Sequence, residues 1–120
     1  FREQIYPGTI SSDVHQFNVD GPVFDLATTL SKFLLLGMSI EEVVRRATWN
    51  PAQAFPFPHQ PGTLKTGVIG DAAVFEMREG KWEFTDSLGA TRGGNHKLTP
   101  VATVKAGRVY GNALIPVVRA

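Results

Sequence analysis

Cysteine is absent from this sequence. The chain therefore has no disulfide framework, no thiolate nucleophile and no thiolate metal site. This absence fits a reducing compartment, and we predict a cytoplasmic protein. Charge of one sign is also scarce, because the formal net charge is only +1. No basic field exists to attract nucleic acid or an acidic membrane surface, so neither partner is predicted.

Long apolar runs are missing as well. The longest, residues 33–36, is far too short to span a bilayer, and no secretory signal is visible. The composition, with 42% hydrophobic and 19% charged residues, lies in the range of folded globular domains. The sequence therefore predicts a folded protein with no membrane span.

The first half of the chain has helical periodicity. A short strand over residues 9–14 leads into a polar loop over residues 15–22, and Pro22 suits the first position of a helix. Gly37 is expected to end that helix in a left-handed conformation. Ser39 and Glu42 form the pattern of a capping box for a second helix.

A third, short helix is predicted to begin at Asn50 and Pro51, with Asn50 as its cap. Lys32 falls on the polar side of the first helix, so we expect it to face solvent. The scattered prolines after Phe55 predict a stiff connector.

Beyond the connector the apolar period approaches two, which is typical of strands. Strands are predicted over residues 72–77, 81–85 and 98–105, with a turn at 78–80 and a loop at 89–95. Ala106 and Gly107 are expected to turn the chain into a further strand. The second half is therefore predicted to be antiparallel sheet.

An acidic residue at the end of the first predicted strand could be a catalytic residue. Residues 9–15 read TISSDVH, and a loop closed by Gly21 and Pro22 follows. Asp13 stands where enzymes often place a catalytic carboxylate, but a turn or helix-cap acid would look the same. One strand followed by helices also cannot bury both of its faces alone, so the pattern reads as the last unit of something larger.

Several segments in order resemble the amidohydrolase superfamily, most of all its dihydroorotase-like amidohydrolase/deacetylase group. Residues 9–15 (TISSDVH) and 21–26 (GPVFDL) are similar to the end of the family's barrel. Residues 31–38 (SKFLLLGM) and 46–52 (RATWNPA) continue the likeness. The segments GTLKTG and GDAAVF, beginning at Gly62 and Gly70, are similar to the family's re-entry into its small β-sandwich. The segment VKAGRV, beginning at Val104, is similar to the closing hairpin of that sandwich.

This resemblance implies an α/β fold consisting of a C-terminal fragment of a (β/α)8 barrel followed by antiparallel strands of a small β-sandwich domain. The expected boundaries are residues 1–58 for the last barrel strand and helices, and 59–120 for the sandwich portion. The chain begins at Phe1 rather than Met, which agrees with a start farther upstream.

The family's activity implies a metal-dependent hydrolase acting on amide, cyclic amide or ester bonds of a small-molecule substrate. Asp13 matches the family's aspartate that contacts the metal and transfers the proton of the attacking water. The metal we expect is a divalent ion, zinc in the first place. Such chemistry lies at the C-terminal ends of barrel strands. We expect the loop residues His15, Asn18, Gly21 and Pro22 to contact substrate, with an ordinary turn as the alternative.

The chain departs from the family in its histidines. It has three, His15, His59 and His96, and no His-x-His pair. One carboxylate does not hold a catalytic divalent ion, which needs about three protein ligands. We therefore expect the parent enzyme to bind the metal and the isolated chain to bind none and to be inactive.

The alternative is a non-catalytic domain that binds a partner or itself. A truncated barrel exposes a strand edge and helix faces, and such surfaces favour pairing with another copy. This view predicts a homo-oligomer or a domain-swapped assembly.

Overall fold

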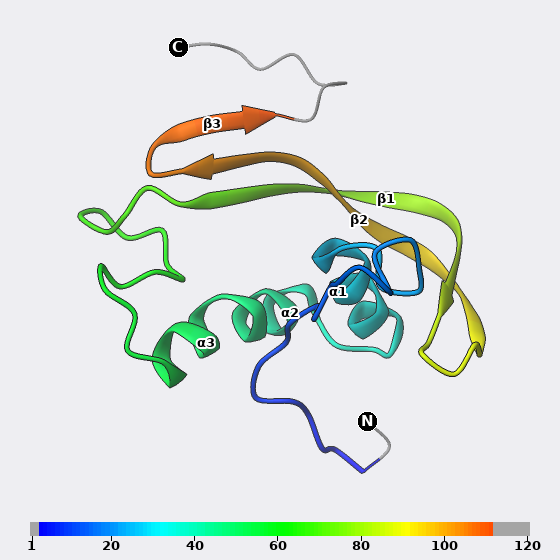
Figure 1. Cartoon of the computed structure of the whole chain (residues 1–120). Coiled ribbons are helices and arrows are strands. Elements are labelled where there is room, and N and C mark those ends of the chain that lie inside the picture. The colour runs from blue at the N-terminus through cyan, green and yellow to red at the C-terminus, as the bar shows by residue number, and fades with distance from the viewer. Residues whose placement is uncertain (1–2, 112–120) are drawn as a thin grey trace.

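The computed structural model describes residues 3–111 of the 120-residue chain. Three helices are followed by a three-stranded antiparallel sheet with the order β1-β2-β3. The bounds are α1 Leu26–Leu35, α2 Ile40–Ala47, α3 Trp49–Ala54, β1 Ala72–Thr85, β2 Thr91–Lys105 and β3 Arg108–Gly111. The long β1–β2 hairpin runs across the top of the molecule, and the helices lie together on one side of it (Figure 1).

The hydrophobic core lies where α1 and α2 meet the sheet and the N-terminal segment. Val43 of α2 is fully buried, and Leu98 brings β2 into the same cluster. Burial of such side chains is the main favourable term in folding. The cluster consists of Ile10, Ala27, Leu30, Met38, Val43 and Leu98, with Phe33, Leu34 and Ala47 packed against it.

Helix α1 begins later than the sequence predicted. Pro22 is not its first residue; instead the Asp25 carboxylate caps the helix by accepting a hydrogen bond from the Thr28 N–H at 2.7 Å. The Asp25 side chain gives a free N–H of the first turn an acceptor. A proline at the first position gives none, because it only removes its own N–H. The helix end was predicted correctly, because Gly37 has a φ of 98° and its N–H donates to the Leu34 carbonyl.

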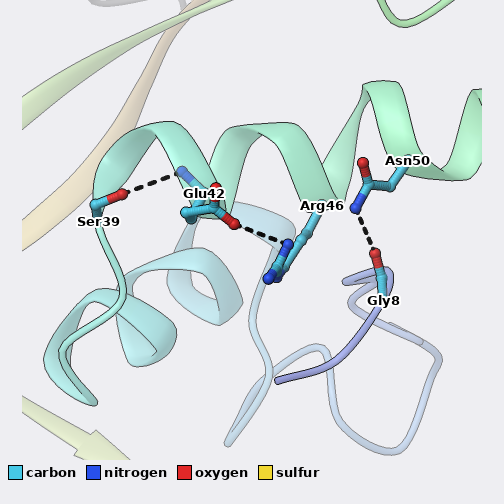
Figure 2. A network of polar contacts seen from close by, with 5 residues as sticks. All are labelled: Gly8, Ser39, Glu42, Arg46 and Asn50. Atoms are coloured by element: carbon cyan, nitrogen blue, oxygen red, sulfur yellow. Dashed lines mark hydrogen bonds and ion pairs between the residues drawn. The ribbon is translucent and has the colours of Figure 1, made fainter. Parts of the chain in front are cut away.

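Helix α2 has the predicted cap at Ser39, whose hydroxyl accepts from the Glu42 N–H at 3.3 Å (Figure 2). The Glu42 carboxylate pairs with Arg46 one turn later, at 2.9 Å, so only one arm of the capping box is used. The prediction that Asn50 caps α3 was wrong. Asn50 lies inside α3, and its side-chain N–H donates to the Gly8 carbonyl at 2.8 Å (Figure 2).

The strand predicted over residues 9–14 is also wrong. This segment makes one backbone bond to a helix, from the Ile10 N–H to the Arg46 carbonyl at 2.8 Å. In the described part of the chain no strand lies beside this segment. A β-strand needs a neighbouring strand to pair its backbone N–H and C=O groups. The φ of 49° at Asp13 also interrupts the extended backbone.

The sheet is longer and more continuous than predicted. The turn predicted at residues 78–80 is absent, because β1 passes through it as one strand with a register shift between Glu79 and Trp82. A bulge takes up an extra residue without ending the pairing. Of the loop predicted at residues 89–95, only the first two residues lie outside a strand, because β2 starts at Thr91. The turn at Ala106 and Gly107 was predicted correctly.

The α/β class is confirmed by this arrangement of helices and sheet. The boundary between residues 58 and 59 falls in the connector between α3 and β1 and stays a prediction. None of the helices in residues 3–111 is both long and apolar enough to cross a membrane.

Candidate functional site

The loop that follows the N-terminal segment is organised around Asn18. Its side-chain oxygen accepts from the His15 N–H at 2.8 Å, and its side-chain N–H donates to the Asp13 carbonyl at 3.1 Å. Its own carbonyl accepts from the N–H groups of Gly21 and Phe24 at 3.1 and 3.2 Å. An asparagine side chain that replaces backbone partners in this way is typical of tight loops. Asn18 therefore connects both ends of the loop.

Asp13 is exposed, and its backbone, not its carboxylate, is held by the loop. Within residues 3–111 the carboxylate accepts no hydrogen bond and forms no ion pair. Its φ of 49° lies in the left-handed region, which aspartate tolerates better than most residues. The loop thus presents a free carboxylate from a fixed backbone position.

His15 is exposed and interacts with its own loop. Its Nδ1 accepts from the Phe17 N–H at 3.2 Å, and the two rings meet edge to face with centroids 6.0 Å apart. Because Nδ1 is an acceptor, the neutral ring carries its proton on Nε2. That nitrogen has no partner within residues 3–111.

Gly21 and Pro22 close the loop and are both half-buried. The Pro22 carbonyl accepts a hydrogen bond from Lys32 Nζ at 2.8 Å, and the same nitrogen donates to the Thr85 carbonyl at 2.7 Å. The prediction that Lys32 faces solvent was wrong, because these two carbonyls draw its ammonium between α1, the loop and the end of β1. Burial lowers the pKa of Lys32, and the nearby Asp86 carboxylate acts in the opposite direction.

Sequence reasoning missed two of these interactions. Asn18 was predicted to contact substrate, which stays a prediction; the hydrogen bonds of its amide within the loop were not foreseen. The run from Asp13 to Gly21, rich in turn formers, carried a signal for such an Asn-centred turn. Lys32 carried no signal, because its partner Thr85 is 53 residues away in sequence.

The described residues do not fit a metal ion by themselves. No group of three or more His, Asp or Glu side chains that could hold one occurs in residues 3–111. His96 lies in β2, where Nε2 is 3.8 Å from Glu79 Oε1 across the sheet, and His59 lies in the connector. The three histidines therefore stand on separate parts of the fold, and only His15 shares the loop with Asp13.

Cavities occur away from this loop. One, of about 380 Å³, is lined by Glu41, Val44, Arg45, Trp49, Thr63 and Lys65. Another, of about 250 Å³, is lined by Leu34, Leu35, Gly93, Gly94, Asn95 and His96. Neither includes Asp13 or its neighbours in the loop. The predicted site is therefore an exposed loop rather than an enclosed pocket.

Comparison with known proteins finds deacetylases and a deacetylase-like domain family. The family described as the deacetylase-like composite domain matches residues 64–111, which include all three strands. A deacetylase of Enterococcus faecalis is 35% identical over 92% of this chain and 30% of its own length. A deacetylase of Brucella anthropi is 33% identical over 93% of this chain and 28% of its own length.

Solved structures show the same relationship. The crystal structure of an adenine deaminase superposes with a TM-score of 0.87 and 34% identity, over 92% of this chain and 30% of the deaminase. That of a dihydroorotase gives a TM-score of 0.82 and 32% identity, over 92% of this chain and 29% of the other. This chain therefore spans about 30% of the length of the relatives that it matches. The resemblance inferred from the sequence is confirmed: the chain belongs to the amidohydrolase superfamily and corresponds to the C-terminal segment of its deacetylase-like members.

Proposed function

We propose that this chain supplies a catalytic aspartate, Asp13, to a metal-dependent hydrolase that cleaves amide, cyclic amide or ester bonds of small molecules. The observation that carries this proposal is the free carboxylate of Asp13 on a loop whose backbone is held by Asn18. The kinship with deacetylases over 92% of the chain supports the reaction class. The absence of cysteine supports a cytoplasmic location for this enzyme.

The chemistry of Asp13 in this proposal is proton transfer. A carboxylate with no internal partner accepts a proton from the attacking water and then gives it to the departing amine or alcohol. The exposed position of Asp13 leaves it open to substrate and to groups from other parts of the enzyme.

The metal, zinc in our proposal, requires ligands from outside the described residues. Asp13 offers one carboxylate, and residues 3–111 contain no companion set of donors around it. A catalytic zinc site needs about three protein ligands. We therefore assign the remaining ligands to other parts of the enzyme, and we expect the isolated chain to be inactive.

The substrate side of the site is proposed to lie along the same loop. His15 Nε2 is available for a polar contact, and Gly21 and Pro22 shape the surface at the other end of the loop. Asn18 acts by holding this surface in place, since both polar atoms of its side chain are engaged.

A chimeric enzyme tests the proposal. The matching segment of the Enterococcus faecalis deacetylase, 30% of its length, is replaced by this chain, and hydrolysis of an acetylated amine is measured. We expect an active chimera, and we expect Asp13→Asn to lower kcat by about 10²-fold or more, because the general base is lost. The matched control is Glu83→Gln, an exposed carboxylate on β1, which is expected to leave kcat within about twofold.

The two variants are compared only as folded proteins, so each chimera is first checked for its melting temperature and its metal content. If the Asp13→Asn chimera folds, binds metal and hydrolyses the probe as fast as the Glu83→Gln chimera, Asp13 is not the catalytic base.

A second candidate function is self-association without catalysis. Large apolar side chains are exposed on several segments, including Phe17, Leu64 and Leu88 at 82%, 84% and 93%. Exposed apolar surface of this kind favours contact with a second copy. Light scattering on the 120-residue chain tests this candidate: an oligomer supports it, and a monomer at high concentration contradicts it.

A further inference from the structure

Lys32 joins three segments that are far apart in the sequence. It lies in the last turn of α1, and its Nζ donates to the carbonyl of Pro22 in the loop and to the carbonyl of Thr85 at the end of β1. The two distances, 2.8 and 2.7 Å, are those of strong charge-assisted bonds. The two carbonyls belong to separate parts of the fold, and Lys32 connects them through one nitrogen.

Within residues 3–111, hydrogen bonds hold the loop both internally and to another part of the fold. Asn18 ties the loop to itself, from Asp13 to Phe24, but these bonds do not fix the loop relative to the sheet. The bonds of Lys32 supply that connection at the loop's closing end. We propose that Lys32 is a positioning residue that fixes the loop carrying Asp13 relative to the end of β1.

The environment of Lys32 is consistent with this function. Its side chain is half-buried beneath the loop, and Asp86, which follows β1, is the charged group that acts on it. Partial removal from water strengthens hydrogen bonds from an ammonium group to carbonyl oxygens. An uncharged side chain of similar length would fill the space but would leave both carbonyls without this donor.

The catalytic consequence of this positioning rests on the proposed function, whereas the mechanical claim does not. The test therefore measures the loop itself. Backbone ¹⁵N relaxation of the 120-residue chain gives order parameters for Asn18, Gly21 and Phe24, which are compared with Val43 in the buried core. No hydrolytic activity is required, so failure of this inference is distinct from failure of the proposed function.

Three variants separate positioning from general packing. In Lys32→Met we expect the loop order parameters to fall from about 0.85 to below about 0.6, while that of Val43 stays rigid. In Lys32→Arg, which keeps a cation with several donors, we expect the loop to stay ordered. The control is Lys65→Met, which removes a lysine near the Trp49 ring, 5.9 Å from its centroid, and should leave the loop unchanged.

A direct measurement on the unaltered chain completes the test. We expect a slowly exchanging Lys32 ammonium signal with couplings across hydrogen bonds to the carbonyl carbons of Pro22 and Thr85. If Lys32→Met does not fold, this signal decides the question. Loop order equal to wild type in a folded Lys32→Met, or an Nζ signal without these couplings, would overturn the inference.

Discussion

At the residue scale, single polar side chains in this fold often complete backbone hydrogen bonding. Asn18 does so within the loop, and Asp71 does so at the turn between β2 and β3. The Asp71 carboxylate accepts from Lys105 Nζ at 2.7 Å and from the Ala106 N–H at 2.8 Å. The hydrogen bond from Lys105, followed by that from the Ala106 backbone, lowers the pKa of Asp71.

This pKa shift predicts a pH dependence. Because the pKa of Asp71 is lower in the folded chain than in the unfolded chain, the carboxylate stabilises the fold at pH values above its unfolded pKa, about 3.9. That contribution is lost as the pH falls through the lower, folded pKa. We expect the stability difference between wild type and Asp71→Asn to shrink as the pH falls below the unfolded pKa and through the lower, folded pKa.

Carboxyl ¹³C titration by NMR measures the shift directly. In Lys105→Met the pKa of Asp71 should move toward its ordinary value, because the hydrogen bond from the Lys105 ammonium, which contributes most to the shift, is removed. An Asp71 that titrates near about 3.9 in the folded wild type would contradict this account.

At the scale of elements, helix α1 is docked to the sheet through a buried serine. Strand β3 pairs with β2 only from Ala102 onward, so an earlier part of the same edge of β2 requires another partner. The Ser31 hydroxyl, fully buried, accepts from the Leu98 N–H at 2.9 Å and donates to the Ala27 carbonyl at 2.7 Å. The helix thereby covers an edge that would otherwise leave a buried donor unpaired.

Removing this hydroxyl should be costly. Ser31→Ala leaves the buried Leu98 N–H without its acceptor, and we expect the free energy of unfolding to fall by about 1–3 kcal/mol. Ser87→Ala, in the exposed turn after β1, is the control and should change it by less than about 0.5 kcal/mol. Urea denaturation of both variants measures the difference. Equal midpoints would show that the serine does not dock the helix.

The sequence predicted local features of these elements and missed those that depend on distant partners. Gly37 and Ser39 were identified because helix ends are decided by neighbouring residues. Asn50 was misread as a cap because its partner, Gly8, lies on a segment 42 residues away. The turn predicted near Gly80 was wrong because pairing with β2 carries β1 through that position as a bulge.

For the candidate site, the resemblance pointed to Asp13 and its loop, and their role stays a prediction. The structure shows that the loop is held by internal hydrogen bonds. Lys32 was missed because a lysine on the polar side of a helix usually faces water. Its two carbonyl partners become neighbours only when the helices dock against the sheet.

At the scale of the whole molecule, the chain folds around a small core and, in our proposal, carries one part of a catalytic site. It matches about 30% of the length of its relatives, and its core is built from both helices and sheet. The largest side chains on its surface include many apolar ones, which agrees with our proposal that further protein covers them, from the same enzyme or from another copy.

Zinc titration of the purified 120-residue chain, followed by calorimetry, tests the central claim most directly. If Asp13 is one ligand of a site completed elsewhere, the chain will show no saturable binding of one zinc ion per chain. Saturable binding at that ratio, lost in Asp13→Asn and kept in Glu83→Gln, would show that the chain holds a complete site and would contradict the account.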